Sequence, residues 1–326
     1  MKFTFNKQFM VLMFLLLNCF ACYAANEDLI SKQITLKLTE AGTLPDKIGR
    51  SKMDLVTNLK IIGEINGTDL RFIREMAGSD LYGYRTSGNL SVLDLSEARF
   101  VAGGDYYYEG YGDGCYTSND IIGKYAFLRC RSLTSVIIPS SVTSIGESAF
   151  YYCSSLTSVN IPSSLASIGC GIFLGCSSLT SVDIPSSVTE IGESAFSDCS
   201  SLTSVKIPSS VTSIGERVFE NCSLSSVYVY AETPPSISAN AFEGCDSKNC
   251  TLYVPKGTYD AYWLSEWGIF ENIVEFDVTN IRNIVVEPEA QETARYAVNG
   301  QRLTAPVKGI NLVKYNNGRV KKEIVK

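Results

Sequence analysis

Six cysteines recur at intervals of 23 residues and are the first candidates for chemistry: Cys130, Cys153, Cys176, Cys199, Cys222 and Cys245. Regularly spaced thiols could bind a metal, pair as disulfides or act as nucleophiles. The chain has no histidine, which excludes Cys-His and Ser-His-Asp catalysis and the HExxH zinc motif. Zinc sites usually take cysteines in closely spaced pairs, which a column of single cysteines does not supply. We therefore expect no catalytic residues, metal ligands or cofactors.

The cysteine column also fits disulfides poorly. Side chains in register on neighbouring strands point in parallel, which keeps their Cβ atoms too far apart for an S–S bond. A phenylalanine precedes each cysteine by three residues, so one helical turn places both on the same face. We expect the cysteines to be small buried hydrophobic residues beside stacked phenylalanines. Outside the column, Cys170 is expected to be exposed, and Cys245 is close enough in sequence to Cys250 to pair with it.

Every other position of the 23-residue unit repeats as well, with the consensus L-T-S-V-x-I-P-S-S-V-T-S-I-G-E-S-A-F-x-x-C-S-S. In one copy, Val159 and Ile161 lie on one face of a strand and Asn160 on the other. Pro162 then ends the strand because it cannot donate to a ladder. One unit cannot bury its apolar face, but stacked units can. The sequence therefore predicts an α/β solenoid of parallel strands and short helical turns.

This consensus resembles the BspA-like leucine-rich repeats of bacterial surface proteins. The resemblance rests on the repeated F-x-x-C and I-P-S-S segments of residues 121–255. Members of that family are associated with adhesion to host matrix proteins and to other cells. The resemblance implies a non-enzymatic recognition or adhesion protein, secreted or on the outer cell surface, that binds protein partners.

The first 24 residues have the organisation of a secretory signal peptide. Lys2 and Lys7 precede an unbroken apolar run over 9–17, and Cys22 and Ala24 supply small residues before a cleavage point. Lipidation of Cys22 is the alternative. After cleavage no stretch is long and apolar enough for a transmembrane helix, and the net charge of −6 disfavours nucleic acid as a partner.

Three further segments flank the regular repeats. Residues 25–120 are predicted to form an N-terminal cap of degenerate repeats, with a helix over 69–77 that has Thr68 as its N-cap. Residues 256–276 are predicted to form a C-terminal cap, with a short helix over 259–267. Residues 277–326 read as a small β-module with Asn-Gly turns. It resembles the C-terminal modules of Bacteroidetes-type surface proteins, so it either sorts or anchors the chain or is only an appended domain.

Two sets of residues are candidates for partner binding. The first is the outward column of the sheet, which varies on an otherwise uniform scaffold: Ile137, Asn160, Asp183, Lys206 and Tyr228. The second is a tyrosine-rich insertion, whose rings offer large contact area: Tyr106, Tyr107, Tyr108 and Tyr111. The alternatives are that the residues of the exposed column vary because nothing constrains them, and that the tyrosines pack over the N-terminal cap. The insertion also suggests a second function, a glycan-binding accessory protein.

Overall fold

The structure is a computed structural model that describes residues 29–110, 112, 114–278, 292–297, 301–303, 305–315 and 320–325. The predicted signal peptide, Tyr111 and both predicted Asn-Gly turns lie outside these residues. The chain forms two compact units, residues 1–276 and 277–326. Within the described residues, no helix is both long and apolar enough to cross a membrane.

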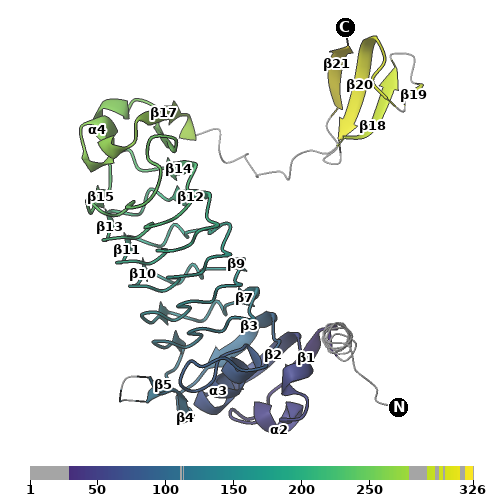
Figure 1. Ribbon diagram of the computed structural model, residues 1–326, viewed down its shortest axis with the longest axis vertical. Helices are drawn as coiled ribbons and strands as arrows, with labels where there is room; N and C mark the ends of the chain where they lie inside the picture. The colour runs from purple at the N-terminus through teal and green to yellow at the C-terminus, as the bar shows by residue number, and fades with distance from the viewer. Residues whose placement is uncertain are drawn as a thin grey trace, which may run out of the picture. The chain divides into compact units, whose positions relative to one another are not determined.

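Parallel strands dominate the first unit, and its repeats stack one after another along the chain (Figure 1). One five-stranded sheet has the order β1 (Ile34–Lys37), β2 (Asn58–Ile65), β3 (Val92–Phe100), β7 (Ser135–Ile137) and β9 (Ser158–Val159). A four-stranded sheet continues with β12 (Ser204–Ile207), β14 (Ser226–Val229), β16 (Thr251–Pro255) and β17 (Asn272–Phe276). Between them, residues 181–184 contribute only an isolated bridge from Asp183 to Lys206.

A second set of short parallel strands is formed by a two-residue segment of each repeat that ends in isoleucine, most often Ser-Ile. Two of these strands pair as β6 (Ile121–Ile122) and β8 (Ser144–Ile145). Four more form the order β10 (Ser167–Ile168), β11 (Glu190–Ile191), β13 (Ser213–Ile214) and β15 (Ser236–Ile237). Each isoleucine of β10 to β15 is buried and the residue before it is at least partly exposed, as the alternation of a half-buried strand requires.

The core of the repeats is a column of stacked phenylalanines with the cysteines beside it. Neighbouring rings from Phe127 to Phe242 lie between 5.0 and 5.7 Å apart and within 20° of parallel. The Cys176 thiol donates to the carbonyl oxygen of Phe150 at 3.3 Å, and five of the six column thiols make this bond to the preceding repeat. The cysteine is therefore both a small apolar residue and a donor that ties one repeat to the next.

The helical turns recur with two backbone positions in the left-handed region. In the repeat that ends at Cys153, these positions are Ser148 and Tyr152, both with φ of 55°. The next repeat has Gly171 and Gly175 there, at 58° and 73°. Glycine adopts this region without strain. At Gly175 a Cβ would also stand 2.9 Å from the ring of Tyr152, so glycine makes room for that ring.

The N-terminal cap has two helices that pack against each other, and the second also contacts β2 of the first sheet. These are α2 (Leu44–Ile48) and α3 (Gly67–Met76), with a 3₁₀ turn, η1, at Met53–Leu55. The prediction of Thr68 as N-cap is wrong, because Asn66 accepts from the Thr68 amide and Asp69 accepts from the Asn66 amide. Helix α3 therefore begins two residues earlier than expected. The tyrosine-rich insertion forms an antiparallel pair, β4 (Gly103–Tyr108) and β5 (Cys115–Thr117).

The C-terminal cap covers the end of the phenylalanine column with further aromatic rings. The predicted helix over 259–267 is divided into α4 (Tyr259–Trp263) and a 3₁₀ turn, η2 (Glu266–Ile269). Phe242 contacts Trp267 and Phe270 at centroid distances of 5.6 and 5.1 Å. The indole of Trp267 donates to Pro235 O at 2.8 Å, which satisfies its polar group in the core.

The second unit contains an antiparallel sheet, as the strand patterns indicated. Its order is β19 (Arg302–Leu303), β18 (Glu292–Ala297), β20 (Gly309–Tyr315) and β21 (Val320–Val325). The pairing of β20 with β21 brings Lys314 opposite Val320, so the last two strands form the expected hairpin.

Candidate functional site

The outward face of the two main sheets has one continuous column of variable residues. Strand register aligns Lys60, Asp94 and Ile137 across the first sheet. In the second sheet it aligns Lys206, Tyr228, Tyr253 and Val274. The repeat units of Asn160 and Asp183 lie between these two groups. The chemistry therefore changes along the column, from charged residues at the cap to aromatic residues at the far end.

Three of the predicted residues border one shallow hollow of about 430 Å³, namely Ile137, Asn160 and Asp183. Ile137 is 40% exposed and Asp183 is exposed. The side chain of Asn160 is also hydrogen-bonded within the protein. Its amide accepts from Ile138 N at 2.7 Å and donates to Ile138 O at 3.1 Å. These two bonds hold the amide against the preceding repeat, so Asn160 has a structural role while it stays exposed on this face.

The charged end of the column is internally paired. Lys60 lies 3.3 Å from Asp94 and 2.7 Å from Glu97. Burial raises the pKa of Asp94, but hydrogen bonds from Ser96 and Lys60 outweigh it and hold that pKa below its usual value. These groups already satisfy one another, so this end offers a partner little unpaired charge.

Aromatic rings gather at the other end of the column. Tyr228 and Tyr253 stack with centroids 4.4 Å apart and planes within 6°. Phe276 meets Tyr228 and Tyr230 edge-on at 6.2 and 5.5 Å. All four rings are partly exposed, and Val274 beside them is 39% exposed. We call Tyr228, Tyr230, Tyr253 and Phe276 the aromatic cluster.

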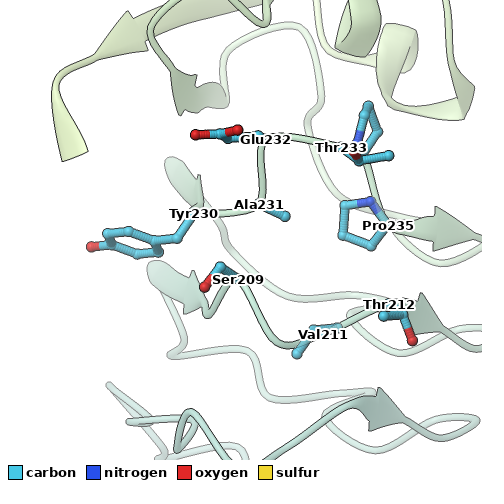
Figure 2. Close-up of a pocket in the computed structure, with 9 residues that line it drawn as sticks. Ser209, Val211, Thr212, Tyr230, Ala231, Glu232, Thr233 and Pro235 are labelled. Carbon is cyan, nitrogen blue, oxygen red and sulfur yellow. The ribbon is translucent and has the colours of Figure 1, made fainter.

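A second hollow of about 540 Å³ adjoins the aromatic cluster, with Tyr230 in its lining (Figure 2). It lies between the loop after β12, which supplies Ser209 and Val211, and the segment 230–235 after β14. In Figure 2 the Tyr230 ring extends away from Pro235, with Glu232 above it. The hollow and the cluster together place apolar rings, hydroxyls and one carboxylate on a single surface.

Only one of the five predicted column residues, Tyr228, belongs to the aromatic cluster, and sequence reasoning missed the other three members. A signal for Tyr253 was present, because Val227-Tyr228-Val229 and Leu252-Tyr253-Val254 share an apolar–Tyr–apolar pattern. Lys206 lies next to Tyr228 in register and borders the cluster.

The tyrosine-rich insertion contributes less exposed surface than predicted. Tyr107 and Tyr108 are only 1% and 5% exposed, and the Tyr107 hydroxyl donates to Lys124 O at 2.9 Å. Burial raises the pKa of Tyr107 well above its usual value. These two rings belong to the core, so they are not contact residues. Tyr106 remains partly exposed and meets Tyr116 edge-on at 6.1 Å.

All nine cysteines among the described residues are free thiols, and Cys245 does not pair with Cys250. Burial raises the pKa of Cys130 to about 11 and that of Cys199 to about 12. Thiols of this kind are protonated at neutral pH and poor nucleophiles. In the described part of the chain, no three His, Cys, Asp or Glu side chains are placed to hold a metal ion.

Repeated parallel strands with short helical turns define the class of leucine-rich repeat proteins. Residues 120–249 are a BspA type leucine-rich repeat region in six copies, which identifies the repeats of this chain. A comparison with curated proteins gave no match.

Two solved structures of bacterial proteins are similar to parts of the chain. One is a leucine-rich cell surface protein from Faecalibacterium prausnitzii, with 39% identity over 36% of this chain and 30% of that one, and a TM-score of 0.33. The other is a leucine-rich repeat protein of T. pallidum, with 34% identity over 41% of this chain and 61% of that one, and a TM-score of 0.36. The chain thus spans less than two thirds of each.

Proposed function

We propose that this chain is a non-enzymatic recognition protein, secreted or on the outer cell surface, whose repeats form a solenoid scaffold with a 23-residue period. Its sheet face binds a protein partner, and a host matrix protein or another cell-surface protein is the expected class. The BspA type repeats and the surface location named for the F. prausnitzii protein support this proposal. The segment 1–24 would direct export, and the second unit would sort or anchor the chain.

The observation that carries the proposal is the aromatic cluster. Tyrosine and phenylalanine are enriched at the centres of protein interfaces, whereas exposed strand positions of a monomer are usually polar. Here four rings adjoin one another on the outward face, next to a hollow. Stacked rings lose little side-chain entropy on binding because they already hold one another in place. Ile137, Asp183 and Lys206 would add contacts along the same face.

The test uses the full chain without its signal segment on an array of extracellular matrix proteins. Tyr228→Ser combined with Tyr253→Ser should weaken binding at least ~10-fold, since each anchor typically contributes 1–2 kcal/mol or more. Tyr259→Ser is the matched control, because Tyr259 is 41% exposed but lies in α4. Equal binding by both variants would remove the cluster from the interface.

A glycan-binding role for the tyrosine-rich insertion is the second candidate. Its support is now the pair formed by Tyr106 and Tyr116, the latter 58% exposed, with Arg71 6.0 Å from the Tyr106 ring centre. Replacing Tyr106 and Tyr116 with serine should abolish retention on a glycan array if this pair is the site. Unchanged retention would dismiss it.

A further inference from the structure

Three arginines gather where the N-terminal cap meets the first regular repeat: Arg85, Arg129 and Arg131. The loop that follows α3 is fixed to this repeat, because Ser79 Oγ donates to Leu128 O at 2.8 Å. A Cβ on Gly83 of the same loop would stand 3.8 Å from Arg129 Cδ. Arg131 in turn donates to Arg129 O at 3.4 Å. We call these three residues the arginine cluster.

The positive charge of the arginine cluster is not neutralised by the protein. None of the ion pairs in the described part of the chain includes any of the three arginines. The carboxylate of Asp80, on the same loop, instead accepts from the amides of Tyr82 and Tyr84 at 2.9 and 2.7 Å. Burial, followed by the charges of Arg129 and Arg85, lowers the pKa of Arg131. An arginine nevertheless stays cationic at neutral pH.

A fourth guanidinium, that of Arg74, lies at the same junction between the loop after α3 and the first regular repeat. Arg74 is fully buried, and its nitrogens donate to Tyr125 O at 2.7 Å and to Asp80 O at 3.0 Å. It too makes no ion pair in the described part of the chain. Four unpaired guanidinium groups at one junction are unexpected in a chain with a net charge of −6. An external anion would compensate this potential.

Exposed tyrosines border the arginine cluster on both sides. Tyr82 and Tyr84 are 52% and 70% exposed, and their ring centres are 6.5 Å apart. On the other side, Tyr152 is 42% exposed and occupies the same repeat position as Arg129. Guanidinium groups bind sulfate and carboxylate with paired hydrogen bonds, and an exposed aromatic ring can pack against the C–H face of a sugar.

We propose that the arginine cluster, with Tyr82, Tyr84 and Tyr152, binds an anionic polysaccharide that carries sulfate or carboxylate groups. The surface lies on a loop and on helical turns rather than on a strand edge. A peptide therefore cannot bind here by adding a strand to a sheet edge. A chain of charged sugars needs only contacts with guanidinium groups and aromatic rings. This activity is separate from protein binding by the outward sheet face.

The test measures binding of the full chain, without its signal segment, to immobilised dextran sulfate, hyaluronan and neutral dextran. The variant Arg85→Gln/Arg129→Gln/Arg131→Gln should bind the anionic polymers at least ~10-fold more weakly and with a shallower dependence on salt, as expected when cationic contacts are lost. The matched control Arg50→Gln/Lys248→Gln/Lys256→Gln removes the same charge elsewhere and should retain binding. Arg85→Gln alone, at an exposed position, should show a smaller loss if the triple variant does not fold.

The arms of this experiment separate the ligand classes. If dextran sulfate binds more tightly than hyaluronan, the preferred anionic group is sulfate. If hyaluronan binds more tightly, the preferred group is carboxylate. Equal binding of neutral dextran, equal loss in both triple variants, or no binding to either anionic polymer overturns the proposal. Binding of polyglutamate as tight as that of the polysaccharides would also overturn it, since it would indicate an acidic protein. The Tyr228→Ser/Tyr253→Ser variant should bind the polysaccharides normally, which keeps this test independent of the proposed protein-binding function.

Discussion

Asn160→Asp is the substitution that best separates a structural role of this residue from a recognition role. The change keeps the oxygen that accepts from Ile138 N but removes the donor to Ile138 O. It also places a carboxylate oxygen against that carbonyl, near the present 3.1 Å contact. Loss of the bond and the unsatisfied acceptor together should lower the free energy of unfolding by about 1–3 kcal/mol.

Urea unfolding followed by circular dichroism measures this loss, and Asp183→Asn is the matched control. Asp183 is exposed on the same face. Asp183→Asn exchanges the same two groups in the opposite direction and should alter the free energy of unfolding by no more than ~0.5 kcal/mol. A stability of Asn160→Asp equal to that of the control would refute the structural assignment.

Three further predictions concern the column of phenylalanines and cysteines. Phe173→Ala should lower the free energy of unfolding by about 3–5 kcal/mol in urea titrations, because Phe173 is stacked on both sides; a loss below ~1 kcal/mol would contradict the stacked core. Since burial raises the folded-state pKa of Cys130 and Cys199, their stabilisation is complete below about pH 8.5 and is lost as the pH rises through the folded values. Urea midpoints should therefore fall between pH 8 and pH 11, and less steeply for Cys199→Ala. With a thiol reagent, Cys170 should react first in the native protein and the column cysteines only after unfolding; rapid native reaction of several thiols would refute their burial.

The repeat core could be predicted from sequence because every unit has the same apolar positions and must bury them against the neighbouring units. A phenylalanine followed by a cysteine three residues later admits one arrangement in stacked turns, and the structure has it. The N-cap of α3 was missed although the sequence carries its signal, because Asn66 and Asp69 have the spacing of a capping box whereas Thr68 has Arg71 three positions on.

The candidate site was predicted less well, for two physical reasons. Tyr107 and Tyr108 have the composition of a binding loop, but the strand pair β4–β5 turns their rings into the core. Tyr253 and Phe276 were missed because the repeat loses its regular spacing after Cys222, so their register with Tyr228 became visible only from strand pairing. Which rings adjoin one another depends on that pairing.

The most direct test of the recognition account is hydrogen–deuterium exchange of the full chain with and without a matrix protein that it retains on the array. If the outward sheet face binds the partner, exchange slows on binding in β14, β16 and β17, which carry most of the aromatic cluster. Protection confined to the helical turns around Gly171 and Ser194, with no change in these three strands, would contradict it.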